Sequence, residues 1–173
     1  MTQEPQETDH FRKPPRRRKG ALAIVQNSAG GVLVGARESD DDDSPRWYLP
    51  GGCVNRNENN HDGLVRAAEY RLGVTLKPGR LVVVHRMPEE WHGEGDQRYL
   101  SREGDNYVYN AGKHDYAPGD FTFGPDVVEV RYMLPAEFDE FLPPFMTWRI
   151  QTALRVIETD GHVEELEGHP VVV

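Results

Sequence analysis

The chain has 173 residues, a net charge of −9 and one cysteine, Cys53, and 28% of its residues are charged. A single cysteine excludes an internal disulfide, and no apolar run approaches the roughly 20 residues that a membrane-spanning helix needs. The N-terminus also lacks the apolar core of a secretory signal peptide. We therefore expect a cytoplasmic protein with one folded domain and no membrane partner.

Charge is distributed unevenly along the chain. Residues 1–19 carry six basic and three acidic residues, which leaves a net charge of −12 for the remainder. An acidic body repels phosphates, so we do not expect nucleic acid binding. Residues 1–18 are predicted to be a flexible basic arm, and residues 19–173 a single domain. For this arm we favour a solvated leader over a segment that binds an acidic partner.

Apolar runs, glycines and prolines divide the domain into strands and helices. Residues 21–25 and 32–34 are predicted to form a hairpin, and an acidic loop follows at 38–45. Further strands are expected at 47–49, 80–85, 106–109 and 127–133, and helices at 61–72, after Pro135 and at 145–159. Long loops are expected at 87–105 and 111–125, and an edge strand within the tail at 163–173. This order implies a mixed sheet with helices on both faces.

One stretch, from Trp47 to Val74, combines a short strand, a Pro-Gly-Gly turn, a polar loop and a helix. Asparagines at 57, 59 and 60 favour turns and helix N-caps, because their short side chains bond nearby backbone amides. Gly73 stands where a left-handed residue is expected to end the helix. The apolar positions of that helix recur at helical spacing, at Leu64, Val65, Ala68 and Leu72.

The same stretch carries the residues of a known signature, at Gly52, Glu58, Arg66, Gly73 and Val74. It resembles the box of the Nudix family, and the resemblance extends over roughly residues 18–160. It implies an α/β/α sandwich with a mixed β-sheet. It also implies an enzyme that uses Mg²⁺ to hydrolyse a phosphoanhydride in a nucleoside diphosphate-linked metabolite.

The family signature places three further glutamates on one face of the box helix, where carboxylates hold Mg²⁺. This chain has Ala67, Tyr70 and Arg71 at those positions. An alanine and a phenol supply no carboxylate, and a guanidinium repels a divalent cation. Ordinary Mg²⁺-dependent hydrolysis is therefore the mechanism that we least expect, and Glu58 is the remaining candidate metal ligand of the box.

Other residues near the box are candidates for catalysis or metal binding. Glu58, His61 and Asp62 lie in the loop and first turn, and such a group is able to bind a transition metal. We favour instead an N-terminal cap by Asp62 and a structural pair between Glu58 and Arg66. Glu129 is a further candidate acid on a later strand.

Arginine binds phosphate through two parallel hydrogen bonds and stays charged. Arg66 and Arg71 are therefore candidates for holding an anionic ligand without metal, with Tyr70 as a hydrogen-bond or proton donor. A box that has lost its function explains these residues equally well. Trp91 and Tyr109 are candidates for stacking on a ligand ring, although core packing explains such residues more simply.

The sequence predicts a Nudix-superfamily protein that acts on a small phosphorylated metabolite and has lost the usual Mg²⁺-binding glutamates. Two alternatives stay open: metal-independent chemistry on another small molecule, and a non-catalytic ligand-binding or regulatory protein. A homodimer is compatible with each. The catalytic candidates are Glu58, His61, Arg66, Tyr70 and Arg71, and the substrate-binding candidates are Trp91, Tyr109 and Glu129.

Overall fold

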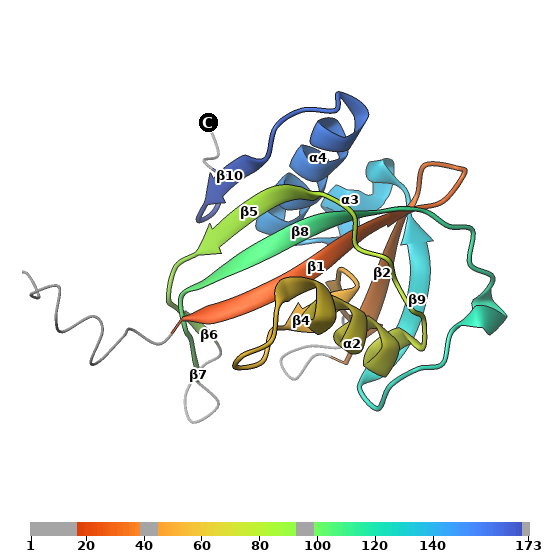
Figure 1. Ribbon diagram of the computed structural model, residues 1–173, viewed down its shortest axis with the longest axis horizontal. Coiled ribbons are helices and arrows are strands. Elements are labelled where there is room, and N and C mark those ends of the chain that lie inside the picture. The colour runs from red at the N-terminus through yellow and green to blue at the C-terminus, as the bar shows by residue number, and fades with distance from the viewer. Residues whose placement is uncertain (1–16, 39–44, 93–98, 171–173) are drawn as a thin grey trace, which may run out of the picture.

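The computed structural model describes residues 17–38, 45–92 and 99–170, and its centre is a mixed eight-stranded sheet (Figure 1). The strand order is β10-β5-β8-β1-β2-β3, with β4 beside β1 and β9 beside β2. β1 runs parallel to β8 and β10 parallel to β5, while the other pairs are antiparallel. The strands of this sheet are β1 (Arg18–Gln26), β2 (Val32–Arg37), β3 (Arg46–Tyr48), β4 (Gly51–Cys53), β5 (Leu81–Met87), β8 (Gly104–Lys113), β9 (Val127–Met133) and β10 (Glu164–Glu167).

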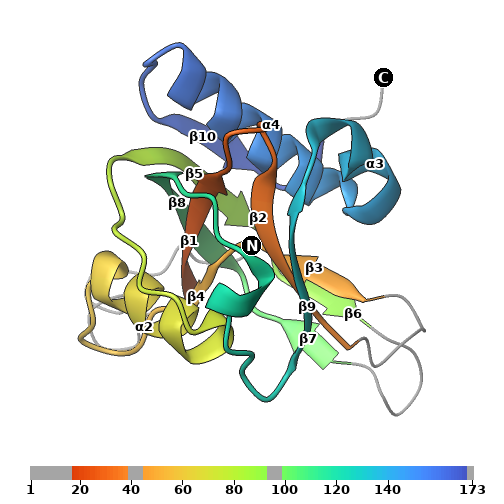
Figure 2. The same cartoon turned by 90° about the vertical axis from the view of Figure 1, so that its right-hand side faces the viewer.

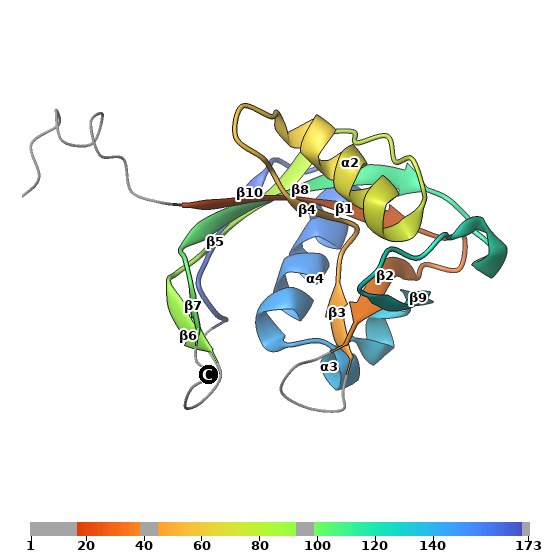
Figure 3. The same cartoon turned by 90° about the horizontal axis from the view of Figure 1, so that it is seen from below.

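Helices cover both faces of the sheet. Figure 3 shows α2 on one side of β1 and α4 on the other, and Figure 2 shows β1 between the same two helices. The α/β fold with a mixed sheet that the sequence predicts is therefore confirmed. The helices are α2 (Asn60–Leu72), α3 (Phe138–Phe141) and α4 (Pro144–Glu158), with short 3₁₀ turns η2 (Pro118–Asp120) and η3 (Pro135–Glu137).

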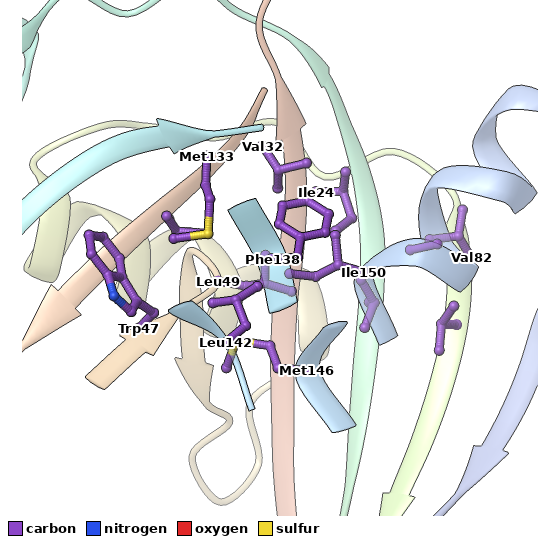
Figure 4. Close-up of a cluster of buried hydrophobic side chains, with 14 of the residues drawn as sticks. Ile24, Val32, Trp47, Leu49, Val82, Met133, Phe138, Leu142, Met146 and Ile150 are labelled. Carbon is purple, nitrogen blue, oxygen red and sulfur yellow. The ribbon is translucent and has the colours of Figure 1, made fainter. Parts of the chain in front are cut away.

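Each face of the sheet has its own hydrophobic cluster. On the α4 side, Phe138 and Ile150 pack against Leu49 and the apolar residues of β1 and β2 (Figure 4). On the α2 side, Leu64 and Leu72 are fully buried against the opposite face of the same strands. Full burial of one such side chain stabilises the fold by about 1.5–3 kcal/mol. The two clusters fix the box helix and the last helix to opposite faces of β1.

The predicted hairpin is present, with Gln26 opposite Val32, and β10 forms within the tail that is expected to add an edge strand. The prediction of a long loop at 87–105 is wrong in part. β6 (Glu90–His92) and β7 (Tyr99–Ser101) form an antiparallel pair there, and β8 already begins at Gly104. Glycines and charges conceal strands this short, because each depends on its partner more than on its own pattern. Residues 1–16 of the predicted arm and residues 93–98 lie outside the described residues.

The segment between β3 and β4 crosses from one half of the sheet to the other. β3 pairs with β2, whereas β4 pairs with β1, and Gly51 lies at the crossing. Its φ is 121°, and a Cβ atom there would lie 2.1 Å from the carbonyl oxygen of Ala21. Only glycine fits this conformation and this close approach. The crossing leads the chain directly into the loop before α2.

Candidate functional site

The box helix α2 begins and ends with the caps that the sequence predicts. Asn59 is the N-cap, and its side-chain oxygen accepts a hydrogen bond of 2.9 Å from the backbone N–H of Asp62. The Asp62 carboxylate in turn accepts a hydrogen bond of 2.6 Å from the Asn59 amide. Gly73 adopts the left-handed conformation, with φ 70°, and ends the helix. Asp62 is therefore part of a cap.

Glu58 and Arg66 form a two-pronged ion pair in front of this helix. Arg66 Nε donates to Glu58 Oε1 at 2.7 Å and Arg66 Nη2 to Oε2 at 2.8 Å. The backbone N–H of Asn55 donates to the same Oε2 at 2.7 Å, and Arg66 Nη2 also donates to the Cys53 carbonyl at 2.9 Å. These hydrogen bonds, led by that from Arg66, lower the pKa of Glu58 to about 2. The pair closes the loop onto the helix and occupies both oxygens of Glu58.

The three box positions at which the resemblance places metal-binding glutamates hold side chains of different chemistry, and each makes different contacts. Ala67 is buried, and a Cβ atom on Gly52 would lie 3.0 Å from its methyl group. Tyr70 is 63% exposed, and the Arg71 guanidinium lies 5.1 Å from the centre of the Tyr48 ring. The Tyr48 hydroxyl has no partner among the described residues, and burial raises its pKa to about 12.

A divalent cation does not fit this set of side chains. Mg²⁺ takes oxygen ligands and is usually held by one or two carboxylates together with waters and substrate phosphates. The box positions offer a methyl group, an exposed phenol and a cation, while the remaining carboxylate, Glu58, is already bound by Arg66. Within residues 17–38, 45–92 and 99–170, no three His, Cys, Asp or Glu side chains converge on a point where a metal ion would be held.

His61 and Tyr109 meet each other rather than the ion pair. Their rings pack edge to face, with centres 4.8 Å apart and planes at 86°. Tyr109 is buried, and its hydroxyl accepts a hydrogen bond of 2.8 Å from the Asn60 amide. This contact fastens the first turn of α2 to β8, which is a packing role for both rings.

The remaining predicted residues lie elsewhere. Glu129 forms an ion pair of 3.6 Å with Arg131, beside Trp47 and Phe141. Trp91 falls in β6, and its side chain is outside the part of the chain that the structure describes. The structure therefore brings Glu58 together with Arg66 and His61 with Tyr109, but it does not gather the predicted residues into one site.

A second region has the form of a binding site. A cavity of about 670 Å³ opens between the start of β1, the end of β5, the β6–β7 hairpin and the first turns of α4. Figure 3 shows that hairpin and α4 on the same side of the sheet. Glu90 is the single carboxylate among the described residues that line the cavity. Five arginines line it, namely Arg17, Arg18, Arg37, Arg102 and Arg149.

Only part of this positive charge is neutralised by neighbouring residues. Arg17 pairs with Glu103 at 2.7 Å and Arg102 with Glu89 at 3.1 Å. The structure gives no ion pair between Arg149 or Arg18 and any carboxylate of the described residues. An excess of guanidinium groups in a concave site attracts anions, above all phosphates and carboxylates. In a protein with a net charge of −9, this cavity is a local exception.

Arg149 is the most buried of the five arginines, with an exposed fraction of only 4%. Its Nε–H donates a hydrogen bond of 3.0 Å to Nδ1 of His85. Burial, with a smaller contribution from the nearby positive charge of Arg18, lowers the pKa of Arg149 to about 10. Arg149 therefore remains protonated at neutral pH, and an anion in the cavity would relieve the repulsion between the two arginines.

The rest of the lining is apolar. Met87, Pro88, Leu100 and Phe145 line the same cavity as the arginines. Small-molecule sites commonly have about this volume and combine apolar walls with a few charged groups. The arrangement suits a ligand that has both an anionic part and a flat or apolar part.

Sequence reasoning did not identify Arg149, although the sequence holds a signal for it. The residue lies on the buried face of α4, between Met146 and Ala153 at helical spacing. A charged residue among apolar positions of one helix face is unusual, because an unpaired buried charge is costly. The helical pattern by itself therefore indicates Arg149 as a candidate binding residue.

Comparisons with known proteins identify the family. A family model described as NUDIX domain matches residues 16–155, which is most of the chain. The chain therefore belongs to the NUDIX domain family, and the resemblance of the box stretch is confirmed. None of the helices within the described ranges is long and apolar enough to cross a membrane.

Solved structures are also similar to the chain. It is similar to the MutT protein from Methanosarcina mazei Go1, with a TM-score of 0.60, 17% identity and coverage of 84% of this chain and 96% of that one. It is also similar to a UDP-X diphosphatase, with a TM-score of 0.62, 14% identity and coverage of 92% and 73%. At these identities the likeness shows the fold.

One curated relative shares more of its sequence over a shorter stretch. The low-salt glycan biosynthesis protein Agl8 of Haloferax volcanii is 43% identical over 56 residues, which is 32% of this chain. The match spans 35% of the length of that relative.

Proposed function

We propose that this chain acts on a small nucleoside diphosphate-linked or related phosphorylated metabolite and holds it in the arginine-lined cavity. The observation that carries the proposal is the presence of Arg149, buried and without a carboxylate partner among the described residues, in the wall of that cavity. Phosphate oxygens are the ligand atoms that a guanidinium binds best. The similarity to a UDP-X diphosphatase supports a nucleoside diphosphate as the class of ligand.

We further propose that binding does not require Mg²⁺. In metal-dependent enzymes that cleave phosphoanhydrides, a divalent cation neutralises charge, orients the phosphates and activates water. Here the arginines of the cavity supply the positive charge, and the box supplies no set of carboxylates for the metal. Arg18 and Arg149 would bind the phosphates, while Phe145 and Met87 would exclude water from the apolar part of the ligand.

The structure favours the cavity over the box as the place of recognition. Arg66, which the sequence suggests as a ligand for an anion, is bound by Glu58 and by the Cys53 carbonyl. Arg71 packs on the Tyr48 ring. Positions 66 and 71 are also separated by about 140° around the helix, because each residue adds about 100°. The two arginines therefore do not form a joint anion site in this conformation.

Isothermal titration calorimetry tests the proposal. UDP-glucose and ADP-ribose are titrated into the full chain in EDTA and, separately, in Mg²⁺, and hydrolysis to the nucleoside monophosphate and the sugar phosphate is measured in parallel. We expect at least one of these ligands to bind with the same Kd in both buffers. Arg149→Met should weaken that binding by roughly 30-fold or more, because loss of one partner of a buried charge pair costs about 2–5 kcal/mol.

Arg155→Met is the matched control. Arg155 lies on the same helix, but its side chain is 59% exposed and pairs with Glu164. This variant should bind both ligands like the wild type. Binding or hydrolysis of either ligand that requires Mg²⁺ and disappears in Glu58→Gln would instead identify a metal-dependent enzyme that works at the box, and would overturn the proposal.

A further inference from the structure

A chain of buried hydrogen bonds links the C-terminal part of the protein to the arginine-lined cavity. His85 is fully buried in β5, and its Nδ1 accepts the hydrogen bond from Arg149 Nε. Since Arg Nε is always a donor, Nδ1 carries no proton and Nε2 must carry it. Nε2 lies 2.8 Å from the carbonyl oxygen of Gly168 and donates to it. Each partner therefore fixes the same tautomer of His85.

The Gly168 carbonyl is itself held in place by the sheet. β10 lies parallel to β5, with Leu166 beside His85. Directly after β10, the N–H of Gly168 donates to the Arg86 carbonyl at 2.8 Å. Gly168 adopts a left-handed conformation, with φ 67°. This turn directs its carbonyl back towards His85, so the position of the acceptor depends on the docking of β10.

His85 binds only one of the three nitrogens of the Arg149 guanidinium and leaves the other two available to a ligand. Arg149 uses Nε for His85, and the structure gives its two terminal nitrogens no hydrogen bond to any residue within the described ranges. Trp148 packs edge-on to His85, with ring centres 5.5 Å apart. The Arg149 guanidinium also lies 5.6 Å from the centre of the Phe145 ring. The guanidinium is thus fixed on one edge while its other edge lines the cavity.

A carboxylate in the place of His85 would have neutralised this arginine. A neutral imidazole instead orients the guanidinium through one hydrogen bond and leaves its full charge for a ligand. Burial, together with the charge of Arg149, lowers the pKa of His85 to about 4. The ring is therefore uncharged at neutral pH and does not repel Arg149.

We propose that His85 and the segment of β10 and Gly168 are positioning elements of the cavity, and that they hold Arg149 in the orientation in which it binds an anion. This inference rests on the proposed function in one respect, namely that the ligand of the cavity is anionic. It makes affinity for the ligand depend on the docking of the C-terminal segment, through a residue that never touches the ligand. A long side chain that is already ordered in the ligand-free protein loses less conformational entropy on binding. Fixing Arg149 beforehand therefore raises the affinity for the ligand.

The first test compares two substitutions of His85. His85→Leu removes both hydrogen bonds, whereas His85→Asn keeps an oxygen near the position of Nδ1 that accepts from Arg149. We expect His85→Leu to weaken UDP-glucose binding at least about tenfold, as expected for a displaced charged donor. His85→Asn, which keeps the acceptor for Arg149 but lacks the donor to Gly168, should recover part of this loss. Circular dichroism and thermal unfolding establish that both variants are folded.

The second test acts on the far end of the hydrogen-bond chain. Gly168→Val forces a β-branched residue into the left-handed conformation, and nothing lies within 4 Å of the added Cβ atom. Gly30→Val is the matched control, because Gly30 has φ 83°, equally open surroundings and a place in the β1–β2 turn. We expect only Gly168→Val to weaken ligand binding.

NMR of the ligand-free protein separates this inference from the proposed function. Long-range ¹H–¹⁵N spectra of His85 should show a proton on Nε2, and the Arg149 Nε–H signal should be protected from exchange. That protection should be lost in His85→Leu and in Gly168→Val but kept in Gly30→Val. If the wild type binds neither UDP-glucose nor ADP-ribose, the proposed function fails, whatever the spectra show. A proton on Nδ1, or a folded His85→Leu variant that binds UDP-glucose as tightly as the wild type, would overturn the positioning role.

Discussion

Two arginines, Arg66 at the box and Arg149 in the cavity, differ in the charge of the side chain that accepts their hydrogen bonds. Arg66 faces a carboxylate and a carbonyl, so its charge is cancelled within the protein. Arg149 faces an uncharged imidazole, so its orientation is fixed but its charge is not cancelled. The charge of the partner thus decides whether an arginine closes a loop or remains available to a ligand. In this chain the box arginine is paired within the protein, whereas we propose that the cavity arginine binds a ligand.

The largest effect is expected when the cavity is given a carboxylate of its own. Asn106 lines the cavity, is 8% exposed, and becomes an acid of the same shape in Asn106→Asp. An aspartate there would add a negative charge to the lining of the cavity and would repel phosphate. We expect UDP-glucose binding, measured by calorimetry, to weaken roughly 100-fold, because misplaced like charges cost several kcal/mol.

Asn110→Asp provides the control for that substitution. Asn110 lies at the other end of β8, where its side chain accepts a hydrogen bond from Gly112. Both substitutions change the net charge by the same amount, so a general charge effect would weaken binding equally in the two variants. Equal loss of affinity in the two variants would show that the cavity is no more sensitive to an added negative charge than the rest of the surface.

A smaller effect is expected in the pH dependence of stability. His85 has a pKa of about 4 in the folded protein, below its ordinary value of 6.5. Between these values the unfolded chain binds a proton that the folded chain does not, so folding loses stability as the pH falls from about 6.5 to about 4. We expect the free energy of unfolding to lose about 2–3 kcal/mol from this group over that range. Urea unfolding at several pH values measures it.

His85→Asn removes the titrating group and should flatten this part of the pH profile. The groups that face the His85 ring are Arg149 and the Gly168 carbonyl, with His169 close by, and they stay in place in this variant. Parallel profiles for the wild type and His85→Asn would show that His85 is protonated equally in the folded and unfolded chains. The lowered pKa that keeps the imidazole uncharged beside Arg149 below neutral pH would then be absent.

The smallest effect is expected at the box itself. Glu58→Gln weakens the pair with Arg66, which is partly exposed, and exposed pairs contribute little to stability. We expect the thermal midpoint to fall by a few degrees at most and the affinity for UDP-glucose to stay unchanged. The lowered pKa of Glu58 means that the wild type keeps this contribution above pH 4.5 and loses it as the pH falls towards about 2. A loss of affinity for UDP-glucose in Glu58→Gln would show that the box contributes to ligand binding and would contradict this prediction.

Local features of the box follow directly from the sequence. Asn59, Gly73 and the Glu58–Arg66 pair depend on residues within one loop and one helix, and their roles are determined by short-range backbone geometry. The fold also follows, because the box spacing resembles a family whose architecture is known. What these residues would bind does not follow, since it depends on groups that the pattern does not contain.

The cavity depends on contacts that span the whole chain. Its arginines come from the start of β1 and the residue before it, from the end of β2, from the residue after β7 and from α4. The β6–β7 pair that helps to enclose the cavity falls in a stretch whose composition predicts a loop. No local sequence pattern shows which of these arginine side chains lie near one another in the folded protein. Only Arg149 carries a signal in the sequence, as a cation on the buried face of a helix. That is why the site residues expected from the sequence cluster at the box rather than at the cavity.

The hydrogen bond between His85 and Gly168 also joins two parts of the chain that lie far apart in the sequence. Gly168 follows His85 by 83 positions, and α4 lies between them in the chain. A chain that ends before β10 would therefore carry Arg149 and His85 but would lack the acceptor that fixes the imidazole. We expect a variant truncated before β10 to bind the ligand weakly, although all the described residues that line the cavity are still present in it.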